Sequence, residues 1–141
     1  MGVKRVSPEE ARELMDQQGY AYVDVRSIPE FEAGHPAGAY NVPVLHMGPG
    51  GRMAPNPDFL GVMEAGFAKN ATIVVGCRSG GRSLQAAMML AASGFTNVVD
   101  QRAGFEGMGP GSEPGWRPKG LPVSLKGDPE RTYESLKAKA P

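Results

Sequence analysis

The chain has 141 residues, the length of one ordinary domain, with 40% hydrophobic and 21% charged residues. This composition is typical of a folded soluble protein with its own core and excludes a disordered chain. Fifteen basic and fifteen acidic residues give a formal net charge of zero. The chain therefore lacks the positive field that nucleic acids and anionic membrane surfaces attract, and we expect neither as a partner. One domain over residues 1–141 is expected.

The chain has a single cysteine, Cys77, which excludes an intrachain disulfide. The disulfide-rich scaffolds of small secreted proteins are therefore excluded as well. No apolar run approaches the roughly 18 residues of a membrane span, and the N-terminus is charged where a signal peptide needs an apolar stretch. We expect a cytoplasmic protein whose one thiol serves either in packing or in chemistry.

In the first half of the chain, helices are expected to begin at Ser7-Pro8 and at Asn56-Pro57, because a capping side chain precedes a proline at both places. The first of these helices runs to Gly19. Residues 20–25 are rich in aromatic and β-branched residues and predict a strand. The rest of this half is expected to form a helical turn ended by Gly34, a short strand over 39–43 and a loop over 47–56.

In the second half, the apolar run 72–75 predicts a buried parallel strand, and the run 83–93 predicts a helix ended by Gly94. A further strand is expected over 95–99 and an irregular loop over 107–122. Asp128-Pro129 predicts a final helix through about Lys139, in a tail that either packs or frays. Strands that alternate with helices predict an α/β fold, a parallel sheet with helices on both faces.

The segment 77–83, with the sequence CRSGGRS, lies between the predicted buried strand and the helix that follows it. This is the carboxyl edge of the sheet, where α/β proteins bind ligands. Backbone amides that turn inward around the Cys77 sulfur form a cradle for an anion, and the helix dipole and nearby arginines favour the nucleophilic thiolate. A cysteine after a strand is more often a small buried hydrophobe. Two arginines and two glycines within five residues favour the nucleophile instead.

Three motifs of the sequence resemble the rhodanese domain, the single-domain sulfurtransferase family. CRSGGRS from Cys77 resembles its active-site loop, Asp24-Val25-Arg26 with Glu30-Phe31 and 34–43 resembles its upstream signature, and Gly115-Trp116 through Val123 resembles its C-terminal signature. The resemblance covers about residues 5–124 and leaves 125–141 as a helical tail. It implies an open parallel sheet of about five strands and a persulfide on Cys77. The cradle and substrate-binding residues would be Arg78, Ser79, Gly80, Gly81 and Arg82.

The resemblance implies a thiosulfate sulfurtransferase that needs no metal or other cofactor. The Cys77 thiolate would attack a small-molecule sulfur donor, and cyanide or a thiol acceptor, including a protein thiol, would take the sulfur from the persulfide. Arg78 makes the pocket cationic, which favours thiosulfate over mercaptopyruvate. An alternative is a sulfur-relay module with a specific protein acceptor. A phosphatase or arsenate reductase is less favoured, because cysteine-dependent phosphatases place five residues between cysteine and arginine, whereas only 78–81 separate Cys77 from Arg82.

Several further side chains are expected near this loop. We expect Asp24, Arg26 and Glu30 to form an ion-pair network that supports the loop, because sulfur transfer from a preformed thiolate needs no general base. Ser83 is expected to be a supporting residue as well. The remaining candidates are Arg102, which either reaches the pocket rim or lies exposed in a loop, Trp116, expected to anchor its loop, and the 47–56 loop, expected to contact an acceptor protein.

Overall fold

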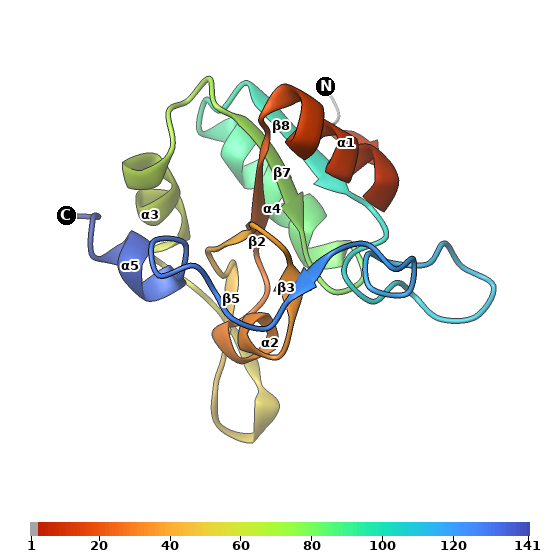
Figure 1. The fold of residues 1–141 in the computed structure, drawn as a ribbon. Coiled ribbons are helices and arrows are strands. Elements are labelled where there is room, and N and C mark those ends of the chain that lie inside the picture. Colours follow the sequence, from red (N-terminus) through yellow and green to blue (C-terminus); the bar gives the residue numbers. More distant parts are fainter. Residues whose placement is uncertain (1–2) are drawn as a thin grey trace.

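The computed structural model describes residues 3–141 and contains one five-stranded parallel sheet in the order β1-β8-β7-β2-β4 (Figure 1). Its strands are β1 (Lys4–Val6), β2 (Ala21–Asp24), β4 (Tyr40–Asn41), β7 (Thr72–Gly76) and β8 (Asn97–Gln101). The α/β class and the parallel sheet are therefore confirmed. The sequence did not predict β1, because three residues are too few for a hydrophobic pattern to develop.

The central strand β7 explains why the sheet is covered on both faces. Ile73, Val74 and Val75 are all completely buried, as β-branched side chains in a central parallel strand should be. Ile73 and Val75 belong to one hydrophobic cluster and Val74 to the other. Alternate side chains of β7 thus point into two separate cores, one on each face of the sheet.

Helices cover both faces. They are α1 (Pro8–Gln18), α2 (Ile28–Glu32), α3 (Phe59–Gly66), α4 (Gly81–Ala92) and α5 (Tyr133–Lys137). Residues of α3, α4 and α5 pack in the cluster around Ile73, whereas α1 packs with Val74 in the other. The predicted helix starts are early for α3 and late for α4, which already begins at Gly81.

The C-terminal tail is docked on the core. The predicted start at Asp128-Pro129 is wrong, because Thr132 is the N-cap of α5 and its side chain accepts a hydrogen bond from the Ser135 amide. Tyr133 and Leu136 are buried in the core cluster. The tail therefore packs and does not fray.

Two small antiparallel pairs complete the fold. The segment 47–56, expected to be a loop, contains most of a hairpin of β5 (Leu45–Met47) and β6 (Met53–Pro55), with a 3-10 turn over Pro49–Gly51 between them. β3 (His35–Pro36) pairs with β9 (Val123–Ser124). Strands of two or three residues are too short to show an alternating pattern, so neither pair was predicted.

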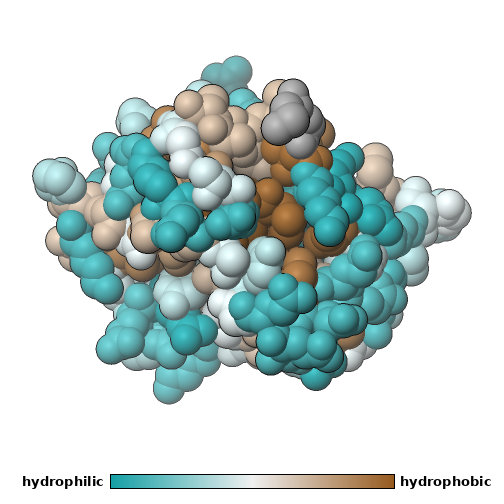
Figure 2. Space-filling model, turned by 90° about the horizontal axis from the view of Figure 1, so that it is seen from above, coloured by the Kyte–Doolittle hydropathy of each residue, from teal (hydrophilic) through white to brown (hydrophobic). Residues whose placement is uncertain are grey.

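The two ends of the sheet differ in character. At the amino ends of the strands, Figure 2 shows a mostly hydrophilic surface with one apolar area. The residues that line a groove there include Val3, Tyr20, Phe95 and Val98. The 77–80 loop lies at the opposite, carboxyl end, where β7 leads into α4. No helix in the described part of the chain is long and apolar enough to cross a membrane.

Candidate active site

The segment 77–80 forms a tight turn between β7 and α4. Gly80 has a φ of 104°, and a Cβ built on it would lie 2.2 Å from the Arg102 carbonyl oxygen, so glycine is required there. The Cys77 side chain is 2% exposed at the inside of this turn. Its sulfur accepts a hydrogen bond from the Gly80 amide at 3.0 Å. The loop therefore curves back over the sulfur.

Ser83 provides the second polar contact of the sulfur. Its Oγ lies 3.4 Å from the Cys77 Sγ and also 3.4 Å from the Gly80 carbonyl oxygen. Ser83 is completely buried in the first turn of α4. The sulfur thus lies at the N-terminus of a helix, beside a backbone amide and a hydroxyl. A helix N-terminus and an inward-facing backbone amide are groups that bind anions.

Arg82, at the start of α4, pairs with Glu30 of α2. Its Nη1 and Nη2 donate to the two carboxylate oxygens of Glu30 at 2.7 and 2.9 Å, and both side chains are 17% exposed. Burial raises the pKa of Glu30, but hydrogen bonds from Arg82 and Ser27 and the charge of Arg82 outweigh it and lower the pKa to about 2. The pair therefore joins α2 to the start of α4, and Arg82 reaches the loop region as a fixed cation.

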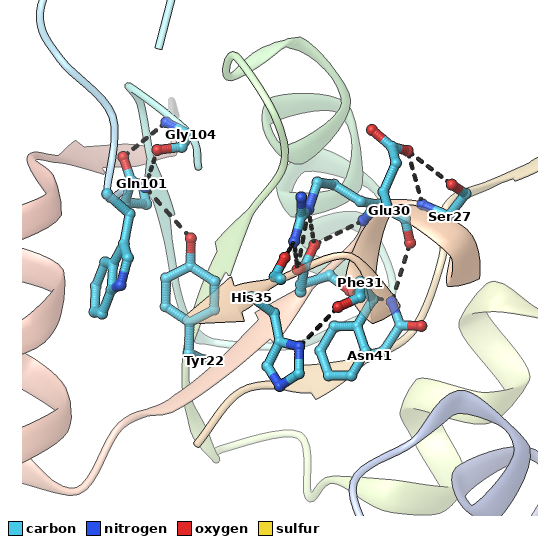
Figure 3. Close-up of polar contacts among 12 residues, drawn as sticks. Tyr22, Ser27, Glu30, Phe31, His35, Asn41, Gln101 and Gly104 are labelled. Atoms are coloured by element: carbon cyan, nitrogen blue, oxygen red, sulfur yellow. Dashed lines mark hydrogen bonds and ion pairs between the residues drawn. The ribbon is translucent and has the colours of Figure 1, made fainter. Parts of the chain in front are cut away.

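Asp24 and Arg26 form a separate buried pair. The Arg26 Nη2 donates to Asp24 at 2.7 Å and to the Gly34 carbonyl at 2.6 Å. The guanidinium stacks on Phe105, 4.4 Å from the ring centre. Asn41 continues the network by donating to the carbonyls of Asp24 and Arg26 at 3.0 Å (Figure 3). In place of the one network that the sequence suggested, two ion pairs flank the region, and this one braces the turn at Gly34.

The remaining predicted residues lie at the surface or in a packed loop. Arg78 is exposed, and Ser79 is half-buried. Arg102 pairs with Glu113 at 2.9 Å and borders a cleft of about 400 Å³ that also touches residues 79–81. Arg102 therefore lies at the rim beside the loop. Trp116 is 1% exposed, and its Nε1 donates to the Pro122 carbonyl at 2.7 Å, which fixes the loop around it.

Sequence reasoning missed the contribution of β1. Arg5 pairs with Asp100 at 2.7 Å and donates from its Nη2 to the Gly80 carbonyl at 3.3 Å. Burial raises the pKa of Asp100, although hydrogen bonds with Ser83 and Arg5 oppose this. Arg5 thus supports the turn from outside. The only sequence signal was a basic residue near the N-terminus, which a short edge strand turns toward the loop.

Sequence reasoning also missed the segment behind the loop. The Phe105 amide donates to the Cys77 carbonyl at 2.7 Å, and the Glu106 amide donates to the Arg78 carbonyl at 3.0 Å. Gly104, whose φ is 77°, lies so close that a Cβ on it would be 2.3 Å from the Arg78 oxygen. A glycine after a strand was the one available sign of this contact. The arrangement gives a buried thiol inside a tightly packed loop, with a main-chain amide and a hydroxyl in contact with its sulfur.

Known proteins are similar to this chain in sequence and in fold. "Thiosulfate sulfurtransferase 16, chloroplastic" of Arabidopsis thaliana is 42% identical over 105 residues, which are 74% of this chain and 80% of that protein. "Senescence-associated protein DIN1" of Raphanus sativus is 45% identical over 95 residues, and the chain spans 51% of its length. The crystal structure of Rv0390 from M. tuberculosis matches with a TM-score of 0.74 and 27% identity, over 89% of this chain and 100% of that one.

The family follows from a match that includes the loop and both ion pairs. The family model described as a rhodanese-like domain matches residues 7–109. That range includes Cys77, the Asp24–Arg26 pair, the Glu30–Arg82 pair and Gly104. The motifs that suggested the resemblance and the structure that they form agree, and the chain belongs to the rhodanese-like domain family.

Proposed function

We propose that this protein is a thiosulfate sulfurtransferase, which moves a sulfane sulfur through a persulfide on Cys77 to cyanide or a thiol acceptor. The observation that carries the proposal is the Gly80 amide, 3.0 Å from the Cys77 sulfur, inside a turn that opens a helix. The Arabidopsis relative that is named a thiosulfate sulfurtransferase supports the same chemistry. A cysteine that only filled space in a core would not need a hydrogen-bonded loop around it.

The reaction has two nucleophilic steps. The Cys77 thiolate attacks the outer sulfur of thiosulfate, a new S–S bond forms, and the old S–S bond breaks with its electron pair leaving on sulfite. Cyanide or an acceptor thiolate then attacks the outer sulfur of the persulfide, and the Cys77 thiolate is released. The negative charge stays near the Gly80 amide, the Ser83 hydroxyl and the N-terminus of α4 throughout, which stabilises each charged state.

The charges around the loop support an anionic donor. Arg82 is occupied by Glu30, so the cation available to an incoming anion is Arg78, which is exposed and forms no ion pair within residues 3–141. Its position next to Cys77 in the chain suits attraction of the thiosulfate dianion. The same pairing argues against a phosphatase or arsenate reductase, in which an arginine of the loop must bind the oxyanion itself.

A sulfur-relay module with a protein acceptor is the second candidate function. The β5–β6 hairpin exposes Met47 and Met53 by 40% and 39%, and these residues pair across its two strands. Exposed methionines are common on surfaces that bind other proteins. If transfer to a protein thiol is the main activity, Met47→Ser with Met53→Ser will slow that transfer and leave transfer to cyanide unchanged.

The proposed function is tested by loading the purified protein with thiosulfate and recording its intact mass. We expect a gain of about 32 Da, one sulfur atom, that cyanide removes and that Cys77→Ser lacks. Ser93→Ala, a change on the far end of α4, is the control and should load normally. Absence of loading from thiosulfate, mercaptopyruvate and a low-molecular-weight persulfide would overturn the proposal. Hydrolysis of a phosphate ester that depends on Cys77 would replace it with the phosphatase.

A further inference from the structure

The main chain of residues 104–106 sets the direction of the loop's peptide groups. The carbonyls of Cys77 and Arg78 accept hydrogen bonds from the amides of Phe105 and Glu106 at 2.7 and 3.0 Å. In a trans peptide the C=O and N–H groups point in opposite directions. The next amides of the loop are therefore turned away from this segment. The loop therefore packs directly against the main chain of residues 104–106.

Two glycine contacts make this fit tight. A Cβ on Gly104 would lie 2.3 Å from the Arg78 oxygen and 2.6 Å from the Ser79 nitrogen. A Cβ on Gly80 would lie 2.2 Å from the Arg102 oxygen. Backbone thus touches backbone with no side chain between them that could adapt. A shift of Gly104 must therefore move the loop that carries the Gly80 amide.

One side chain holds Gly104 in place. The Gln101 Nε2 donates to the Gly104 carbonyl at 2.9 Å, and its Oε1 accepts from the Gly104 amide at 2.8 Å. Gln101 is completely buried at the end of β8, and its Nε2 also lies 3.3 Å from the Tyr22 hydroxyl (Figure 3). The Gln101 Oε1 is the partner of the buried Gly104 amide, whereas the Gly104 carbonyl also accepts a hydrogen bond from the Trp116 amide at 2.9 Å.

We propose that Gln101 is a positioning residue for sulfur transfer, which fixes Gly104 against the loop and so sets the Gly80 amide on the Cys77 sulfur. The inference rests on the proposed function. Gln101 does not touch the sulfur, and its effect passes through two backbone contacts. Mispositioning of a group that stabilises charge slows the chemical steps more than it weakens donor binding.

The test compares Gln101→Met, which keeps the length of the side chain and removes its hydrogen bonds, with wild type. We expect single-turnover rates of loading by thiosulfate and unloading by cyanide to fall about tenfold, with KM for thiosulfate changed less than twofold. Gln101→Glu keeps an acceptor for the Gly104 amide but places a second acceptor against the Gly104 carbonyl, so its rates should also fall below those of wild type. If Gln101→Met does not fold, this second variant carries the test.

The matched control is Asn56→Leu. Asn56 is a buried amide that donates to the Pro43 carbonyl at 2.9 Å and to the Tyr133 hydroxyl at 3.1 Å, and neither partner belongs to the loop. Asn56→Leu should lower the melting temperature by about as much as Gln101→Met does and leave both rates at wild-type values. If Gln101→Met lowers the melting temperature but keeps both rates, Gln101 is purely structural and the inference is wrong. If wild type itself takes no sulfur, the proposed function fails instead.

Discussion

The loop at Cys77 is held on two sides by different kinds of interaction. On one side, α2 holds the start of α4 through the Glu30–Arg82 ion pair, which is 17% exposed at both side chains. On the other side, the segment 104–106 holds the loop through neutral hydrogen bonds of the main chain. The charged side responds to pH and salt, whereas the neutral side does not. The two sides can therefore be weakened separately.

The two sides also differ in what they fix. The ion pair acts at the end of a long side chain, so the loop backbone keeps some freedom when the pair is lost. The neutral side touches the loop backbone itself, and at Gly104 no space is left for a methyl group. The neutral side should therefore determine the geometry of the cradle, and the charged side should mainly contribute stability.

The largest effect is expected for Gly104→Ala. The new Cβ would lie 2.3 Å from the Arg78 oxygen at a φ of 77°. We expect a loss of about 3 kcal/mol or more in the free energy of unfolding and a fall in turnover of at least tenfold. Urea unfolding and steady-state kinetics measure the two effects.

Gly120→Ala is the control for the backbone strain alone. Its φ is 76°, and no atom lies within 4 Å of the position of its Cβ. We expect a loss of about 1–2 kcal/mol from the left-handed conformation and normal turnover. Equal losses for the two variants would mean that the loop does not depend on its contact with Gly104.

A smaller and pH-dependent effect is expected for Glu30→Gln. Hydrogen bonds to Arg82 and Ser27 lower the pKa of Glu30 from 4.5 to about 2. An acid whose pKa falls on folding stabilises the folded state above its unfolded pKa and loses that stabilisation as the pH falls through the folded pKa. At pH 7 the variant should therefore be less stable by about 1–2 kcal/mol. The difference from wild type should shrink between pH 4.5 and about 2.

Unfolding by urea at pH 7 and at pH 3 checks this prediction. Glu64→Gln is the control, because Glu64 pairs with Lys69 at the surface with both side chains about half exposed, and such pairs contribute little. If the wild-type advantage over Glu30→Gln is the same at both pH values, the stabilisation does not come from the ionised carboxylate.

The sequence indicated the charged side of the loop and not the neutral one. Asp24, Arg26, Glu30 and Arg82 are charged residues in recognisable motifs, so they could be proposed as candidates without coordinates. Which charges pair was not predictable, because the Glu30–Arg82 contact joins residues 52 positions apart. Main-chain hydrogen bonds leave no signature in residue type, and this is why the segment 104–106 was missed.

Short elements account for most of the remaining errors in the fold. The apolar run 72–75 predicted β7, and the alanine- and leucine-rich run that ends at Gly94 predicted the helix after it. β1 and the β5–β6 hairpin have strands of three residues. Arg5 was missed for this reason, since its place beside Gly80 depends on the pairing of β1 with β8. Gln101 was missed because the predicted strand ended at Val99, two residues before the observed end of β8.

The smallest effect is expected for Arg78→Gln. Arg78 belongs neither to the Glu30–Arg82 ion pair nor to the segment that packs behind the loop. Arg78 is exposed and forms no ion pair with any residue from 3 to 141, so its loss should leave the free energy of unfolding unchanged. A charge in high-dielectric surroundings contributes about 1 kcal/mol to the attraction of an anion. The KM for thiosulfate should therefore rise about fivefold at low ionic strength with kcat unchanged, and the difference should vanish in high salt.

The control is Arg52→Gln, which removes an exposed arginine of the β5–β6 hairpin. An unchanged KM for Arg78→Gln would mean that the donor is attracted by the fixed charges around the loop, and the separation between a structural Arg82 and a donor-attracting Arg78 would be wrong.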